Sequence, residues 1–305
     1  TVSSRGVYKF PVEDKKSATY DDHQCSSYDV EACSWSNIPD EDFALADDNH
    51  WTIGQFVWTG FDYLGEPSPY DTNAWPNHSS MFGIIDLASI PKDRYYLYRS
   101  VWNKKAETLH ILPHWTWPGR EGKVTPVFVY TNHPTAELFI NGKSYGKQSK
   151  NNSSLKNRYR LMWMDAVYEP GEIKVVAYNK DGKAVAEKIV RTAGKPHHIE
   201  LVSNRNELTA DGKDLAYITV KVVDKDGNLC PADSRQINFS VKGAGKYRAA
   251  ANGDPTNLEQ FHLPKMHTFN GMLTAIVQSG ETAGEIVLTA KASGVKAGNI
   301  RIQTK

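Results

Sequence analysis

Two carboxylate side chains, Asp62 and Glu66, stand four residues apart in the turn-rich stretch 58–67. Paired carboxylates hydrolyse glycosidic bonds, at roughly 5–5.5 Å from one another in retaining enzymes and further apart in inverting ones. Such a pair must flank the scissile bond from two sides, and two residues on one short loop rarely do so. We therefore expect Asp62 to bind hydroxyl groups and Glu66 to accept hydrogen bonds that fix the loop. We do not expect the two to form a catalytic pair.

An aromatic side chain, Trp58, precedes these carboxylates near the end of an apolar run, 51–59. A near-continuous apolar run of this length is typical of a strand buried on both faces, as in a parallel sheet. If this strand belongs to a β/α barrel, the loop after it lies at the end where barrel active sites are built. Trp58 would then offer a flat apolar surface to a sugar ring. The alternative is that Trp58 and Phe61 are core residues.

The stretch 91–102 predicts a helix, because Pro91 suits a first turn and the apolar residues after it follow helical spacing. After residue 105 the sequence consists of short alternating or apolar runs separated by Asn-Gly and Asp-Gly pairs, which predict hairpins. We expect strands at 124–130, 136–140, 172–178, 183–189, 215–223, 235–241, 272–278, 285–292 and 299–303.

These elements predict a mainly β fold. We expect two β-sandwiches, residues 106–194 and 195–305, with a seam at Gly194-Lys195-Pro196. Residues 1–105 form a mixed α/β piece with a strand, a loop and a helix. A buried parallel strand needs neighbours on both sides, so this piece either has its own small sheet or has partner strands in sequence outside the chain.

The composition argues against several classes of function. Lys and Arg number 36 against 35 Asp and Glu, a formal net charge of +1 that gives no support for binding to nucleic acid. No apolar run approaches the roughly 20 residues of a membrane span. No metal-ligand spacing or cofactor motif is present, so we expect neither a metal nor a cofactor. Of the three cysteines, Cys25 and Cys33 are close enough in sequence to pair, and the alternative is three unpaired thiols.

Several long motifs resemble glycoside hydrolase family 2, in particular its β-galactosidase-type members. They are FVWTGFDYLGEPSPY at 56–70, SSMFGIIDLASIPKDRYYLYRSVW at 79–102 and LHILPHWTWPGREG at 109–122. The resemblance continues through VYTNHPTAELFINGKSYG at 129–146, which looks like the β-sandwich that follows the barrel in this family. The family's C-terminal immunoglobulin-like module is resembled by LTADGKDLAYITVKVVDKDGN at 208–228, AANGDPTN at 250–257 and FNGMLTAIVQ at 269–278. The resemblance covers nearly the whole chain and implies that both sandwiches, 106–194 and 195–305, are immunoglobulin-like.

The resemblance implies a retaining glycosidase with two catalytic glutamates on a TIM barrel. It places the nucleophile just upstream of Thr1 and the acid/base further upstream, so we expect no catalytic residue in this chain and no hydrolytic activity from it alone. Residues 52–59 and 92–102 would be the last strand and helix of a truncated barrel. Trp58 matches the aromatic floor of the family's glycone subsite, and Asp62 is similar in position to polar residues near the sugar. The partners implied are a carbohydrate substrate and the missing N-terminal part of the same polypeptide.

The sequence just before Gly83 bears on which sugar is bound. Related β-glucuronidases carry an Asn-x-Lys pair there, whose lysine binds the glucuronate carboxylate, whereas this chain has Ser80 and Phe82. Without that cation a uronate carboxylate would be buried unpaired, so the resemblance favours a neutral β-galactoside. It also implies a periplasmic or secreted bacterial enzyme.

A second hypothesis treats the sandwiches as a carbohydrate-binding or scaffolding module. It depends on Trp115, Trp117 and Trp163 being exposed. The alternative is that Trp115 and Trp117 pack where the barrel meets the first sandwich.

Overall fold

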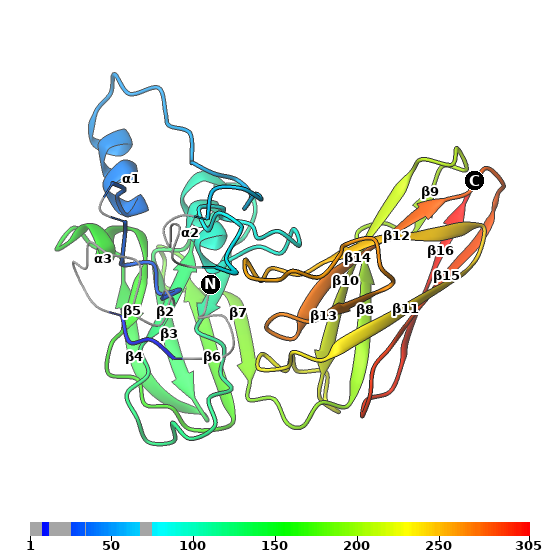
Figure 1. Ribbon diagram of the computed structural model, residues 1–305. Helices are drawn as coiled ribbons and strands as arrows, with labels where there is room; N and C mark the ends of the chain where they lie inside the picture. The colour runs from blue at the N-terminus through cyan, green and yellow to red at the C-terminus, as the bar shows by residue number, and fades with distance from the viewer. Residues whose placement is uncertain (1–7, 12–25, 34, 68–74) are drawn as a thin grey trace.

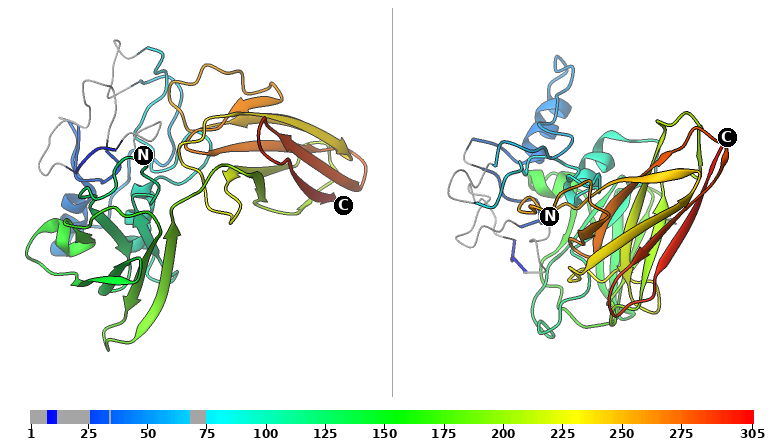
Figure 2. Two further views of the ribbon diagram at one scale, coloured as in Figure 1. Left: turned by 90° about the horizontal axis from the view of Figure 1, so that it is seen from below. Right: turned by 45° about the vertical axis from the view of Figure 1, so that its right-hand side comes forward.

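The computed structural model describes residues 8–11, 26–33, 35–67 and 75–305. Figure 1 shows a helical and irregular segment followed by two β-sandwiches that lie beside each other, with the chain passing from the first to the second between β7 and β8. The prediction of a mainly β fold with two sandwiches is confirmed. The further views of Figure 2 show the two sandwiches set at an angle.

The first sandwich consists of a three-stranded sheet in the order β1-β2-β5 and a four-stranded sheet in the order β4-β3-β6-β7, all antiparallel. Its strands and short helix are β1 (Leu109–Leu112), β2 (Val127–Thr131), β3 (Thr135–Ile140), β4 (Lys143–Ser149), α3 (Leu155–Tyr159), β5 (Leu161–Trp163), β6 (Glu172–Tyr178) and β7 (Ala184–Arg191).

Local sequence explains this arrangement. Strands β3 and β6 alternate strictly between buried and half-buried residues, as expected of strands with one face on a core. Asn141 and Gly142 join β3 to β4 with φ of 48° and 81°, the left-handed conformations that a tight hairpin turn needs. The register of the hairpin then follows from this turn.

Tryptophans fill the core of the first sandwich. Trp115, Trp117 and Trp163 are all buried, and the Trp115 indole N–H donates to the Glu169 carbonyl over 2.9 Å. Trp117 also meets the ring of Tyr8 edge to face at 5.2 Å between centroids. The hypothesis that these three tryptophans form an exposed carbohydrate-binding surface is therefore wrong.

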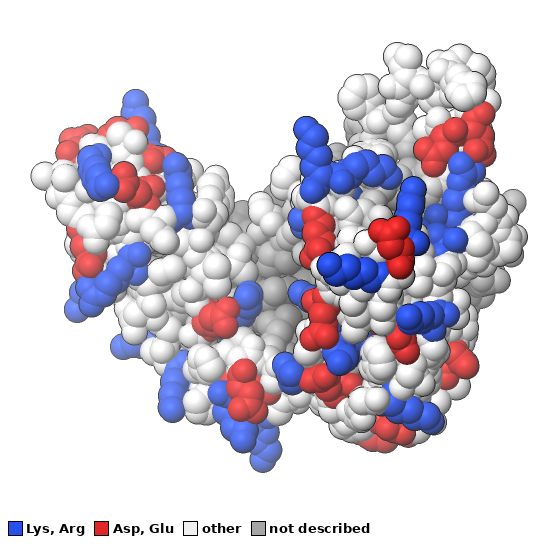
Figure 3. All heavy atoms as spheres, turned by 180° about the vertical axis from the view of Figure 1, so that it is seen from behind, with Lys and Arg blue, Asp and Glu red and all other residues white. Residues whose placement is uncertain are grey.

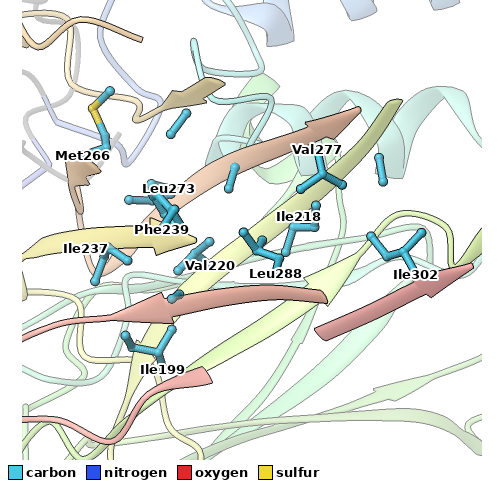
Figure 4. Packing of buried hydrophobic residues seen from close by; sticks show 14 of the residues in the cluster. Ile199, Ile218, Val220, Ile237, Phe239, Met266, Leu273, Val277, Leu288 and Ile302 are labelled. Atoms are coloured by element: carbon cyan, nitrogen blue, oxygen red, sulfur yellow. The ribbon is translucent and has the colours of Figure 1, made fainter. Parts of the chain in front are cut away.

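The second sandwich consists of a four-stranded sheet in the order β12-β14-β10-β8 and a five-stranded sheet in the order β13-β11-β15-β16-β9. Figure 4 shows its core, in which aliphatic side chains from both sheets meet, among them Ile218, Val220 and Leu288. The strands are β8 (His198–Ser203), β9 (Glu207–Leu208), β10 (Leu215–Val223), β11 (Gln236–Gly243), β12 (Gly245–Ala251), β13 (Lys265–His267), β14 (Met272–Ser279), β15 (Gly284–Lys291) and β16 (Gly298–Thr304). Each strand expected after residue 105 is present in one of the two sandwiches.

The segment before the sandwiches contains helices α1 (Pro39–Asp48) and α2 (Asp93–Trp102). Helix α2 confirms the helix expected at 91–102. The strand expected at 51–59 is wrong, because these residues are irregular and pair with no strand in the described part of the chain. Within the described residues, this segment therefore contains no βα unit.

Both helices cover the outer face of the sheet β1-β2-β5, so strand β2 is buried on both sides. Phe43 of α1 contacts Tyr98 of α2 edge to face at 5.1 Å and Tyr159 of α3 at 5.2 Å. Beneath them lies an ion pair between Arg160 and Asp40, whose side chains are both 0% exposed. This buried pair links α1 to Arg160, the residue directly after α3 in the first sandwich.

The charges on the surface are mixed. Figure 3 shows Lys and Arg interspersed with Asp and Glu over the visible face, with no extended area of one sign. Among the described residues, no helix has the length and apolar character needed to cross a bilayer.

Candidate functional site

A cavity of about 400 Å³ lies between two stretches of the N-terminal segment. One wall comes from residues within 26–33 and 35–36, and the other from Trp58, Glu66, residues 81–83 and the start of α2. The lining mixes aromatic, small and charged side chains, as in many small-molecule sites. The Cys25–Cys33 pairing considered above lies outside the described residues, because Cys25 is not described.

Trp58 lines this cavity and is 76% exposed, so it is not a core residue. The backbone beside it is held in place: the Thr59 N–H donates to the Phe82 carbonyl over 3.3 Å, and the Ile84 N–H donates to the Thr59 carbonyl over 3.1 Å. The Trp58–Thr59 peptide bond is cis. An exposed indole on an anchored backbone can stack on the apolar face of a ring.

Asp62 does not line the cavity. Its Oδ2 lies 2.6 Å from the Lys92 ammonium, and its Oδ1 accepts the Gly83 N–H over 2.8 Å. Burial raises the pKa of the Asp62 carboxyl, and the charge of Lys92 opposes that shift. Both oxygens already have protein donors, so the geometry gives Asp62 a structural role, and the expected contact with sugar hydroxyls has no support from it.

Gly83 allows the two sides of this wall to approach each other. A Cβ at Gly83 would lie 2.1 Å from the Asp62 nitrogen and 2.4 Å from the Phe61 carbonyl carbon. Real Cβ atoms do not come so close to backbone, so only glycine fits here.

Glu66 accepts a hydrogen bond from the Tyr63 hydroxyl, in keeping with the expected loop-fixing role. Asp62 is buried and forms an ion pair with Lys92, whereas Glu66 lies at the surface and is hydrogen-bonded to Tyr63. Nothing in this arrangement makes them a pair across a scissile bond.

Asp29 and Arg94, which form an ion pair, are among the charged residues of the cavity lining that were not expected from the sequence. Asp29 has a left-handed φ of 63°, and its carbonyl accepts the Arg160 guanidinium over 2.8 Å. Arg94 could have been found, because it stands three and four residues before the buried Leu97 and Tyr98 and so lies on the inner face of α2. No local signal marks Asp29.

Ser80 and Phe82, which stand where the related β-glucuronidases carry the Asn-x-Lys pair, differ in where they lie. Ser80 is fully buried, and its hydroxyl accepts the Tyr63 N–H over 3.1 Å, whereas Phe82 lines the cavity. The described lysine and arginine of the lining, Lys92 and Arg94, are each paired with an aspartate. In the described part of the chain, no group of three or more His, Cys, Asp or Glu is placed to hold a metal ion.

Two family models match the sandwiches. Residues 199–301 match the model for glycoside hydrolase family 2 C-terminal domain 5, and residues 122–186 match a domain of unknown function, DUF4982.

Curated relatives and a solved structure extend the match to nearly the whole chain. The chain is 41% identical to beta-galactosidase BoGH2A of Bacteroides ovatus, over 99% of this chain and 35% of that protein. It is 34% identical to a putative beta-glucuronidase of Formosa agariphila, over 82% of this chain and 24% of that protein. A crystal structure of a beta-glycosidase from Bacteroides vulgatus superimposes with a TM-score of 0.86 and 31% identity, over 99% of this chain and 40% of that one. The chain thus spans about a third or less of the length of these two curated relatives.

Proposed function

Because the chain belongs to glycoside hydrolase family 2, of which it carries C-terminal domains, we propose that it acts as the C-terminal part of a retaining glycosidase for terminal β-galactosides. The observation that carries this proposal is Trp58, exposed on the wall of a cavity of about 400 Å³ within the motif that resembles the family's glycone subsite. In this proposal the indole stacks on the galactose ring, and Phe82 adds apolar surface beside it.

The remainder of the enzyme would complete the barrel around residues 51–58. Ile53 and Phe56 are fully exposed and Trp51 is 79% exposed, in a stretch whose backbone joins no sheet in the described part of the chain. So much apolar surface on one stretch is characteristic of an interface. Neighbouring strands from the N-terminal part of the polypeptide would bury these side chains and supply the two glutamates, and this chain alone would hydrolyse nothing.

The lining supports a neutral sugar rather than a uronate. A glucuronate carboxylate needs a cation, yet Lys92 and Arg94 are committed to Asp62 and Asp29. Taking either cation for a substrate would leave a buried aspartate unpaired, which is costly. The periplasmic or secreted location implied by the family resemblance is part of the same proposal, and cell fractionation tests it.

The test compares the native polypeptide from the source with the 305-residue chain. We expect a native mass well above 34.1 kDa, release of nitrophenol from nitrophenyl β-galactoside by that polypeptide, and no release by the 305-residue chain. A preference for nitrophenyl β-glucuronide would refute the assignment of the sugar. Hydrolysis by the pure 305-residue chain would refute the assignment of the catalytic glutamates to the missing part.

A further inference from the structure

The loop that forms one cavity wall continues directly to the second sandwich. After Phe82 and Gly83 the chain reaches Ala88, whose carbonyl accepts the hydroxyl of Thr274 on β14 over 2.7 Å in a buried hydrogen bond. On the N-terminal side of the wall residues 81–83, the His78 N–H donates to the carbonyl of Pro255 over 3.1 Å. The second sandwich therefore holds this loop on both sides of the wall.

Asp86 and Gly253 also approach each other closely. The Asp86 Oδ1 accepts the N–H groups of Ala88 and Ile90 over 2.8 and 2.9 Å, which fixes the carboxylate within its own loop. A Cβ at Gly253 would lie 2.0 Å from the Asp86 Oδ2 and 2.7 Å from its Cγ. The loop and the end of β12 thus fit together only because residue 253 has no side chain.

The same loop supports the backbone beside Trp58. Ile84 and Ile85 donate their N–H groups to the carbonyls of Thr59 and Gly60, over 3.1 and 3.0 Å. Asp86, which contacts the second sandwich, directly follows these two residues. Two residues of hydrogen-bonded backbone therefore connect Asp86 to the cavity wall.

We propose that the second sandwich positions the cavity wall, with Gly253 and Thr274 as positioning residues for Phe82 and Trp58. The effect on substrate rests on the proposed function, whereas the docking itself does not. A simple tether between domains would tolerate small changes at this contact without any effect at the cavity, and this difference makes the proposal testable.

The first experiment measures hydrogen exchange in the 305-residue chain and needs no activity. In Gly253→Ala we expect amide exchange across 82–92 to rise about fivefold or more, because the loop opens more readily when its docking is strained. The matched control is Gly194→Ala, whose Cβ would meet Asp224 at an ordinary 3.6 Å, and there exchange across 82–92 stays unchanged. Unchanged exchange in Gly253→Ala would overturn the proposal.

A second pair of variants tests the other contact without adding volume. Thr274→Val keeps the shape but removes the hydrogen bond to Ala88, and we expect faster exchange at 82–92. The control, Thr289→Val, removes an exposed hydrogen bond to Asn299 in the opposite sheet and leaves this region unchanged. Equal effects of the two variants would mean that the contact does not hold the loop.

The third experiment measures steady-state kinetics in the full-length enzyme. We expect Gly253→Ala to raise KM for nitrophenyl β-galactoside several-fold with little change in kcat, because the wall and not the glutamates is displaced. Asp86→Ser shortens the clashing side chain and keeps a local hydrogen-bond acceptor. In the Asp86→Ser background, Gly253→Ala should therefore raise KM less than twofold. Faster exchange at 82–92 without a change in KM would reduce the contact to a tether. An enzyme inactive on β-galactosides would refute the proposed function and leave the exchange results standing.

Discussion

Two arginines that bind the same helix provide a sharp test of what holds α1 in place. Arg160 pairs with Asp40, and both side chains are 0% exposed. Arg158 pairs with Asp48 over 2.7 Å at the surface, where the two side chains are 25% and 58% exposed. The pairs differ in burial while sharing residue types and elements, so Arg158→Met is the matched control for Arg160→Met.

The expected cost of Arg160→Met is about 3–5 kcal/mol, because it leaves the Asp40 carboxylate buried without its cation. The exposed pair is worth less than about 1 kcal/mol. For a unit of this size, each kcal/mol lowers the melting temperature by about 2–4 °C, so Arg160→Met should melt roughly 6–20 °C lower.

The stability that Arg160→Met loses relative to wild type should depend on pH, and the direction of this dependence follows from the pKa of Asp40. Burial raises the pKa of Asp40, and Arg160 opposes the shift, so removing Arg160 raises this pKa further. A carboxyl whose pKa is higher in the folded state than in the unfolded state stabilises the fold at pH values below its unfolded-state pKa, near 3.9. This stabilisation is lost as the pH rises through the folded-state pKa. The deficit of Arg160→Met should therefore be larger at pH 7 than at pH 5.

Tryptophan fluorescence is the appropriate assay. All 8 tryptophans lie at or before Trp163, so the signal reports the N-terminal segment and the first sandwich and does not report the second. Replacing both partners, Arg160→Met with Asp40→Leu, should recover most of the loss, since the Asp40 Oδ1 and Arg160 Nε have no hydrogen-bond partner. Melting of Arg160→Met within 2 °C of Arg158→Met would refute the reasoning.

Two further substitutions test the cavity wall and its contact with the second sandwich. Gly83→Ala places a methyl group 2.1 Å from the Asp62 nitrogen, and we expect a loss of about 1–3 kcal/mol in the same fluorescence melt; an unchanged melt would contradict the close approach. Burial raises the pKa of Asp86 to about 6, so the contribution of this carboxyl to stability should fall by up to about 3 kcal/mol as pH rises from 4 to 6. Asp86→Asn removes this contribution, so wild type should lose about that much stability relative to the variant over this range; the same pH profile in both proteins would contradict it.

The sequence predicted best those elements whose signal is local. Strands β6 and β10 have the expected bounds, because apolar residues recur at the buried positions of EIKVVAY and LAYITVKVV. Strand β4 was missed because its residues are polar and mostly exposed, and its position comes from the Asn141-Gly142 turn and its partner β3. A strand whose position is set by a turn and by its partner strand need not show an alternation of apolar and polar residues.

The N-terminal segment shows where local signals fail. Helix α1 is rich in acidic residues, and its position depends on Arg160, 120 residues away in sequence. The apolar run 51–59 predicted a strand, yet a strand needs hydrogen-bonding neighbours, and none of the described residues supplies them. Such relations are non-local and leave little trace in a short window of sequence.

The candidate site divides in the same way. Residue type and motif identified Trp58, whose exposure the structure shows, although its contact with sugar remains a prediction. They also pointed to Asp62, but its salt bridge with Lys92, 30 positions further along, could not be seen from the loop alone. The Asp29–Arg94 pair joins two walls that only the fold brings together.

The most direct test of the central claim is the hydrolysis of nitrophenyl β-galactoside by the full-length enzyme carrying Trp58→Ala. The matched control is Trp75→Ala, since Trp75 is similarly exposed, at 72%, and does not line the cavity. We predict that kcat/KM falls at least about tenfold in Trp58→Ala, as expected when an aromatic anchor worth about 1.4 kcal/mol or more is removed, and stays near wild type in Trp75→Ala. Equal kcat/KM values for Trp58→Ala and wild type would contradict the claim that this chain supplies a wall of the sugar site.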